Sequence, residues 1–196
     1  MIQSEEELNE AVEKASELLQ DIHEYCGSEN RKWAEYPEAK IRFPRGFIRT
    51  ADTHRRRIPF VNSEDLKSNI AYTLILSDAI LWLSIRTDLW GIPQQMLTKV
   101  YVFILGSICE SVTKNYLHGI KGGGYKPRTA YLAEQEIIDE ELQKDLDWLW
   151  DTRNNMHLFR LAQREYNNEY NDECHTRAVR TFRRLLHALR RTGRLA

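Results

Sequence analysis

The sequence predicts an all-α fold: an up-and-down bundle of four long helices, preceded by an N-terminal helix and an irregular arm. Proline and glycine are rare inside the long segments, helix-favouring residues are abundant, and apolar residues recur at helical spacing instead of alternating. A chain of 196 residues that is 42% hydrophobic and 29% charged is long enough to bury a core and has the composition of a soluble globular protein.

Residues 1–62 are expected to form the N-terminal helix and the arm. The helix is predicted over Glu5–Tyr25, because Ser4 followed by Glu7 matches a capping box. Its apolar positions form one weak stripe between acidic faces: Leu8, Val12, Leu18 and Leu19. The segment Gly27–Val61 contains three prolines and little helical period, so we expect it to be irregular.

Residues 63–196 are expected to form the bundle. Four long helices and one short helical piece are predicted: Ser63 to about Leu89, Pro93–Leu117, the short piece Thr129–Ile138, Asp139 to about Tyr166, and Asp172–Arg191. Short connections favour antiparallel neighbours. The apolar segment Ile70–Ile85 is shorter than the roughly 18–20 residues of a bilayer helix and contains Asp78. We therefore expect a buried core helix and no membrane partner.

The cysteines and histidines indicate neither a disulfide framework nor a metal site. Cys26, Cys109 and Cys174 are far apart, odd in number and without zinc or redox spacing. With no signal peptide in the sequence, a reduced cytoplasmic location is expected. Five histidines lack metal-ligand spacing to one another: His23, His54, His118, His175 and His187. No metal or other cofactor is expected.

The stretch DTRNNMHLF, Asp151–Phe159, places polar residues where the helical period calls for core residues. Counted at about 100° per residue from Leu142, Arg153 falls in the middle of the apolar stripe and His157 falls on its edge. The two residues are four apart, so in a continuous helix their Cβ atoms would lie about 6 Å from each other.

An unpaired arginine in an apolar stripe is costly to bury, and several arrangements would relieve that cost. A carboxylate from another helix could pair with it, and Glu110 and Asp78 are the candidates. The Asn154–Asn155 pair could end the helix and turn Arg153 outward. The stripe could also face a second subunit and form a shared polar site. A purely structural arginine–carboxylate pair with a bystander histidine is also compatible with the sequence.

The segment DWLWDTRNNMHL resembles the signature of the HEPN family of α-helical bundles (higher eukaryotes and prokaryotes nucleotide-binding). That signature is an arginine, often followed by asparagine, and then a histidine, late in the bundle. The helical order is similar too: two long hydrophobic helices, the acidic segment IIDEELQKDLDWL before the motif, and a closing amphipathic helix. The resemblance covers about Ser63–Arg191. The family usually has four to six residues between arginine and histidine, whereas this chain has three, Asn154, Asn155 and Met156.

The resemblance implies a metal-independent endoribonuclease with Arg153, Asn154 and His157 as catalytic residues. A histidine can serve as base or acid near neutral pH, and the planar fork of an arginine matches phosphate oxygens. Asn154 could position the ribose 2′-hydroxyl or hold the imidazole. Because a base and an acid require two histidines, we expect a two-fold homodimer, as the family is known to form.

The family also implies a biological setting and an alternative function. The setting is a bacterial toxin–antitoxin or antiphage defence system, in which an antitoxin or another defence protein would be a partner. The alternative is a non-catalytic HEPN-like module that binds RNA or a protein, with Arg153 and His157 bracing the bundle or dimer. A structural helical subunit without a nucleic-acid role is a third hypothesis.

Basic segments make RNA the expected partner although the net charge is only −1. The arm interleaves arginines with Phe43 and Phe47, which suits single-stranded nucleic acid. Its candidate binding residues are Arg42, Arg45, Arg49, Arg55, Arg56 and Arg57. In the last helix, Arg180 and Arg184 lie on a candidate phosphate track. The competing interpretations are an arm packed on the acidic first helix and arginines paired with the acidic segment Glu134–Asp151.

Overall fold

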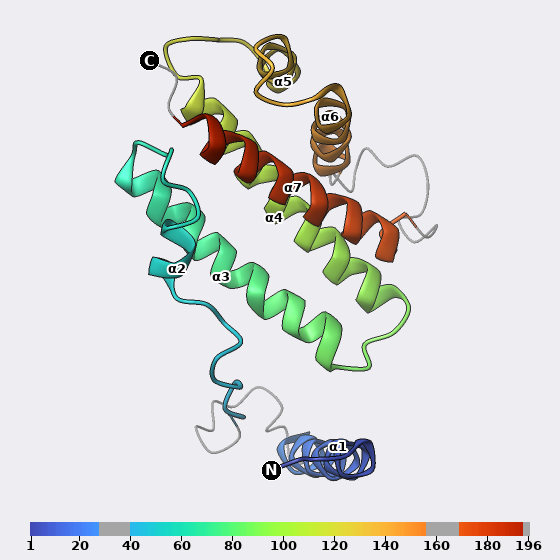
Figure 1. Ribbon diagram of the computed structural model, residues 1–196. Helices are drawn as coiled ribbons and strands as arrows, with labels where there is room; N and C mark the ends of the chain where they lie inside the picture. Colours follow the sequence, from blue (N-terminus) through green and yellow to red (C-terminus); the bar gives the residue numbers. More distant parts are fainter. Residues whose placement is uncertain (28–39, 156–168, 194–196) are drawn as a thin grey trace. The chain divides into compact units, whose positions relative to one another are not determined.

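The computed structural model describes residues 1–27, 40–155 and 169–193 (Figure 1). These residues contain seven helices and no strand, which confirms the all-α prediction. The chain divides into two compact units, Met1–Arg45 and Gly46–Ala196. The division falls between Arg45 and Gly46 instead of after residue 62, so the second half of the arm belongs to the bundle.

The first unit contains α1, Glu5–Gly27. Its start follows the predicted capping residues, because the hydroxyl of Ser4 accepts a hydrogen bond from the Glu7 N–H at 3.1 Å. The Glu7 carboxylate in turn accepts a hydrogen bond from the Gln3 N–H at 2.8 Å. Among the described residues of α1, none is buried.

The arm is not irregular throughout, because the second unit opens with a short helix, α2, Ala51–Arg55. The hydroxyl of Thr50 caps it by accepting a hydrogen bond from the Thr53 N–H at 3.2 Å. The segment that follows is buried: Ile58, Phe60 and Val61 are between 0% and 4% exposed. These three side chains join the hydrophobic core, which explains why this half of the arm packs with the bundle.

Two long helices, α3 (Glu64–Arg86) and α4 (Ile92–Tyr116), form the centre of the second unit. The hydroxyl of Ser63 caps α3, and Pro93 occupies the first turn of α4. The two helices are antiparallel neighbours joined by a short loop (Figure 1). Helix α4 contacts α3, α5, α6 and α7, so it is the axis around which the core is built.

The remaining helices are α5 (Tyr125–Glu134), α6 (Glu140–Asn154) and α7 (Asp172–Thr192). Helix α5 begins four residues before the predicted piece, because Tyr125 is buried against the core instead of lying in a loop. Helix α6 is described to Asn154, and its predicted continuation to Tyr166 lies outside the described residues.

Helices α4 and α7 run parallel to each other, as the second and fourth long helices of an up-and-down bundle do. Tyr116, near the end of α4, donates a hydrogen bond to the carbonyl of Gly193 at the end of α7, at 2.7 Å. Near the starts of the same helices, the rings of Tyr101 and His175 are 4.8 Å apart. In Figure 1, α5 and α6 are seen end-on while α4 and α7 are seen along their length. The departure from the predicted bundle is therefore the orientation of α6, which crosses α4 and α7 instead of lying along them (Figure 1).

By length and composition, α3 and α4 would each be able to cross a membrane. This is weak support for a membrane protein, because core helices of soluble proteins meet the same criterion. Helix α4 is of that kind: 61% of its most apolar window is buried inside the bundle, compared with 33% for α3.

Candidate catalytic site at the end of α6

Arg153 lies in the last turn of α6 and reaches onto α4. Its guanidinium forms an ion pair with Glu110, with Nη2 and Oε2 3.4 Å apart, and Nε lies 3.5 Å from the hydroxyl oxygen of Ser107. Nη1 donates a hydrogen bond to the side-chain oxygen of the neighbouring Asn154 at 2.9 Å. The Arg153 side chain is 27% exposed and that of Glu110 is 30% exposed, so the pair is accessible from solvent.

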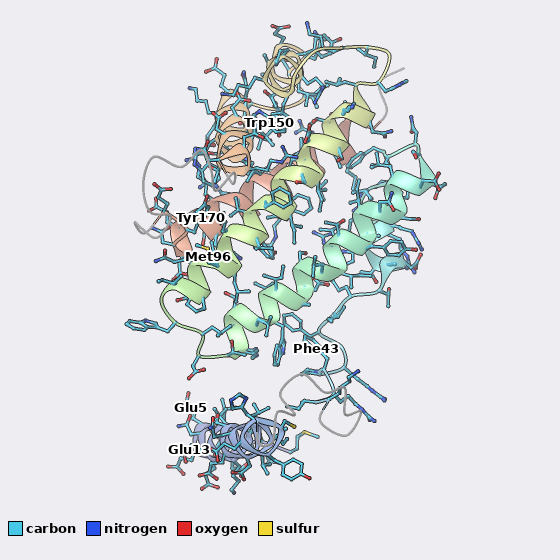
Figure 2. All side chains as sticks on the ribbon, turned by 180° about the vertical axis from the view of Figure 1, so that it is seen from behind. Glu5, Glu13, Phe43, Met96, Trp150 and Tyr170 are labelled. Carbon is cyan, nitrogen blue, oxygen red and sulfur yellow. The ribbon has the colours of Figure 1, made fainter. Side chains whose placement is uncertain are left out.

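Two aromatic rings hold the same guanidinium. The Arg153 Cζ atom is 5.1 Å from the centroid of the Trp150 ring and 5.5 Å from that of Phe103, distances at which cations and rings attract. Trp150, labelled in Figure 2, is stacked in turn on Tyr125, with centroids 4.8 Å apart and ring planes 14° from parallel. Burial raises the pKa of Tyr125 well above its ordinary value, so its hydroxyl stays protonated.

Gly106 lets α6 approach α4 at this point. A Cβ atom added to Gly106 would lie 3.0 Å from Cβ of Arg153, 3.2 Å from its Cγ and 3.4 Å from the carbonyl oxygen of Leu149. Real Cβ contacts are rarely that short. The absence of a side chain at Gly106 therefore leaves the space that the Cβ and Cγ atoms of Arg153 occupy.

Replacing Gly106 by valine is expected to lower the free energy of unfolding by about 1–3 kcal/mol, because it overpacks the α4–α6 contact. The same change displaces Arg153 and should reduce any activity that depends on it. Gly122→Val is the matched control, since a Cβ there meets nothing within 4 Å and its φ is not positive. Urea unfolding measures the difference, and equal stability of the two variants would contradict it.

The candidate catalytic residues are described only in part. Arg153 and Asn154 are adjacent and joined by a hydrogen bond, whereas His157 lies outside the described residues. Of the two carboxylates considered as partners of Arg153, Glu110 forms the pair and Asp78 binds other groups. Helix α6 is continuous to Asn154, and Arg153 is held against α4 instead of turning away from the bundle.

Asp78 is the centre of a buried polar cluster in which Arg49 takes part. The carboxylate accepts hydrogen bonds from the backbone N–H of Arg49 at 3.0 Å and from its Nε at 3.1 Å, and Oδ1 is paired with Nη2. His54 Nε2 lies 3.2 Å from the same carboxylate. Asp78 and His54 are 2% and 0% exposed. Arg49, a predicted RNA-binding residue, thus anchors the arm to α3.

The other arm arginines differ in availability. Arg55 donates a hydrogen bond to the Ser68 hydroxyl at 3.3 Å, and Arg56 is paired with Asp52. Arg57 lies over the Phe182 ring, and burial lowers the pKa of its guanidinium. Two more predicted residues, Arg42 and Arg45, belong to the first unit and are exposed.

Both α7 arginines predicted for a phosphate track are paired with carboxylates of α6 and its N-cap. Arg180 and Arg177 bind the two oxygens of buried Asp145, at 3.3 and 2.8 Å. Arg184 binds Asp139 and Glu141, each at 2.8 Å. This corresponds to the competing interpretation, pairing with the acidic segment. Three exposed α7 arginines have no ion pair within the described ranges: Arg183, Arg190 and Arg191.

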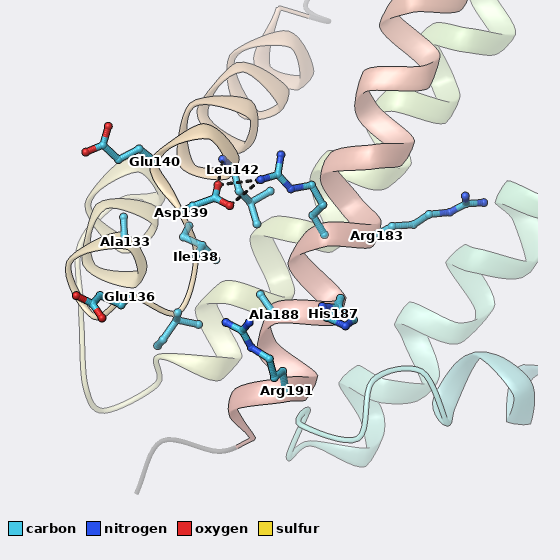
Figure 3. Close-up of a pocket in the computed structure, with 12 residues that line it drawn as sticks. Ala133, Glu136, Ile138, Asp139, Glu140, Leu142, Arg183, His187, Ala188 and Arg191 are labelled. Carbon is cyan, nitrogen blue, oxygen red and sulfur yellow. Dashed lines mark hydrogen bonds and ion pairs between the residues drawn. The ribbon is translucent and has the colours of Figure 1, made fainter.

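A pocket of about 680 Å³ lies elsewhere, between the α5–α6 turn and the second half of α7. Its apolar floor includes Ile138, Leu142 and Ala188, and Figure 3 shows the Asp139 ion pair at its edge. Arg153 is not among its lining residues, so this pocket and the Arg153 site are separate features. Within the described residues, no group of three or more His, Cys, Asp or Glu side chains could hold a metal ion.

Fold and site together define an all-helical bundle with a partly exposed arginine at a helix–helix contact. No family model matches the chain, and no curated protein or solved structure was found to be similar to it. The likeness to the HEPN signature therefore depends on the residues of the motif and on the helical order.

Proposed function

We propose that the chain is an endoribonuclease of the HEPN type that cleaves RNA without a metal ion, with Arg153, Asn154 and His157 as its catalytic residues. The observation that carries the proposal is the state of Arg153: oriented by Glu110 and two rings, yet 27% exposed. A guanidinium that is already ordered can bind a phosphate at a lower entropic cost than a free side chain.

The proposed reaction is an internal transfer at phosphorus. One His157 removes the proton of a ribose 2′-hydroxyl, and the 2′ oxygen attacks the adjacent phosphorus. The bond from phosphorus to the 5′ oxygen breaks, and the His157 of a second chain protonates that oxygen. The products are a 2′,3′-cyclic phosphate and a free 5′-hydroxyl. Arg153 stabilises the negative charge that develops on the phosphate oxygens.

An apolar patch on α4 supports a dimer at this site. Val100 and Phe103 are 44% and 39% exposed, so two large apolar side chains of α4 lie side by side at the surface. They share one face of α4 with Ser107 and Glu110, because residues three and four apart are neighbours on a helix. Phe103 also contacts the Arg153 guanidinium. A second copy that covered this patch would bring two Arg153 side chains near one axis.

The proposed setting is the cytoplasm of a bacterium, in a toxin–antitoxin or antiphage system with an antitoxin or another defence protein as partner. This setting comes from the family resemblance. The exposed arginines of α7 and of the first unit would attract the RNA backbone.

A second candidate function, a non-catalytic module that binds RNA or a protein, is favoured by the fit of Arg153 against Gly106. That fit and the ion pair with Glu110 also brace α4 against α6, a purely structural role. In this case the patch of Val100 and Phe103 would bind the partner.

The test is the chemistry of the RNA ends. Labelled RNA incubated with the chain and EDTA should yield 2′,3′-cyclic phosphate and 5′-hydroxyl ends, and His157→Ala should abolish them. His118→Ala is the matched control, because His118 is exposed and lies outside the motif. RNA binding without cleavage would instead support the second candidate. Cleavage that persists in His157→Ala would contradict the proposed mechanism.

A further inference from the structure

Among the described residues of the first unit, nothing covers the apolar side chains of helix α1. It has 23 residues, and none of those described is buried. Leu8, Val12 and Leu19 are 47%, 55% and 48% exposed, and Ile22 is 37% exposed. Most helices of this length in proteins are stabilised by packing of an apolar face. A helix that keeps its apolar face in water lacks that contribution, so a partner is expected.

The apolar residues follow the seven-residue repeat of a coiled coil. They alternate at intervals of four and three along almost the whole helix: Leu8, Val12, Ala15, Leu19, Ile22 and Cys26. We call these six residues the seam of α1. A 3.5-residue repeat keeps such a seam facing a partner helix over several turns. A helix that packs only on a globular core follows the broader 3.6-residue pattern.

The charges of α1 lie away from this seam. The positions that flank a coiled-coil seam carry no charged side chain between Leu8 and Ile22: Asn9, Ala11, Ser16 and Leu18. From Glu10 onward, the acids occupy the outer positions: Glu10, Glu13, Glu17, Asp21 and Glu24. Flanking charges normally select a heterologous partner, and a basic partner would need acids there. The seam without such charges is complementary to itself.

We propose that α1 pairs with the α1 of a second copy of this chain as a two-stranded coiled coil. Only residues of the first unit enter the argument, so the inference does not depend on the proposed nuclease activity. Because the outer acids of two copies repel each other through solvent, pairing should strengthen as salt rises. Association through basic residues and phosphate would weaken under the same change.

The midpoint of the seam allows one label to report pairing in either orientation. Glu17 lies midway between Leu8 and Cys26 and on the outer face, so its two copies are level in parallel and antiparallel pairs. The experiment uses the full chain with Cys26→Ser and a spin label attached at Glu17→Cys. The distance between the labels of two paired copies should be about 20–25 Å, two helix diameters. Labelling should be selective, because Cys109 and Cys174 are buried.

Leu19→Glu, which places a charge in the seam, is expected to abolish the distance peak at about 20–25 Å. Gln20→Glu adds the same charge at the next, outer position and should keep it. Circular dichroism checks that helix content is unchanged in both. A full chain without this distance, or a distance that survives Leu19→Glu, would overturn the proposal. Docking of α1 on its own bundle or on another protein would give the first of these results.

Discussion

Arg153→Ala is expected to lower the rate of RNA cleavage by about 10²–10³-fold, the usual effect of removing one group that stabilises transition-state charge. Arg153→Lys should recover only part of this loss, because an ammonium lacks the planar fork that binds two phosphate oxygens. The loss should appear mainly in kcat, since the charge on the phosphate grows during the reaction. Single-turnover cleavage at saturating enzyme measures this directly.

Glu110→Gln separates the catalytic role of Arg153 from a bracing role. The substitution removes the ion pair but leaves the Trp150 and Phe103 rings that orient the guanidinium. Because the pair is partly exposed, its loss should cost at most about 1 kcal/mol. A catalytic Arg153 predicts that Glu110→Gln keeps cleavage within about tenfold of the wild type, well above Arg153→Ala. If both variants lose activity equally, and only in proportion to lost stability, Arg153 is a brace.

The long helices could be predicted because their apolar residues recur with a helical period and their ends carry capping residues. Ser63 and Asn171 cap α3 and α7 through their side chains. The short helix α2 was missed because five residues contain too little periodicity to detect. The parallel direction of α4 and α7 agrees with the predicted up-and-down order, whereas helix lengths alone contain no information on how α6 crosses these two helices (Figure 1).

The site shows the same division between local pattern and tertiary contact. The helical period of the sequence predicted that Arg153 lies within an apolar stripe. In the structure, Leu142, Leu146 and Leu149 on that stripe are buried. The contact between Arg153 and Gly106 could not be predicted, because a single glycine within a helix does not indicate which residue packs against it. Arg49 was assigned to RNA because a run of arginines gives no sign of which one meets a buried acid. The available signal was Asp78, an acid in an apolar helix, for which we considered only Arg153 as a partner.

Asp78→Ala is expected to lower the free energy of unfolding by about 1–3 kcal/mol, the usual cost of leaving a buried polar group without its partner. The Arg49 side chain is 43% exposed, so water can solvate its charge once Asp78 is removed. The Asp78 carboxylate is 2% exposed and binds Arg49 through three nitrogen atoms. It also binds Nε2 of His54, whose Nδ1 has no hydrogen-bond partner among the described residues. Without Asp78, both nitrogens of a fully buried imidazole would be left unpaired.

The same cluster should make the bundle sensitive to acid. Burial raises the pKa of Asp78, but hydrogen bonds and charge from Arg49, with the charge of His54, lower it further, to below 3.8. Stability from this carboxylate is therefore present above about pH 4 and lost as the pH falls through the folded pKa. Burial also lowers the pKa of His54 from 6.5, despite Asp78 raising it. The unfolded chain thus gains protons below about pH 6.5 that the folded chain does not, and stability falls.

Urea unfolding at pH 7 and pH 3 tests both parts of this prediction. The gap between wild type and Asp78→Ala should be largest at pH 7 and shrink at pH 3, where the carboxyl becomes protonated as the chain unfolds. Asp52→Ala is the control, because it removes an exposed carboxylate paired with Arg56 and should cost at most about 1 kcal/mol. A gap at pH 7 no larger than that of Asp52→Ala would mean that the arm is held by Ile58, Phe60 and Val61 alone.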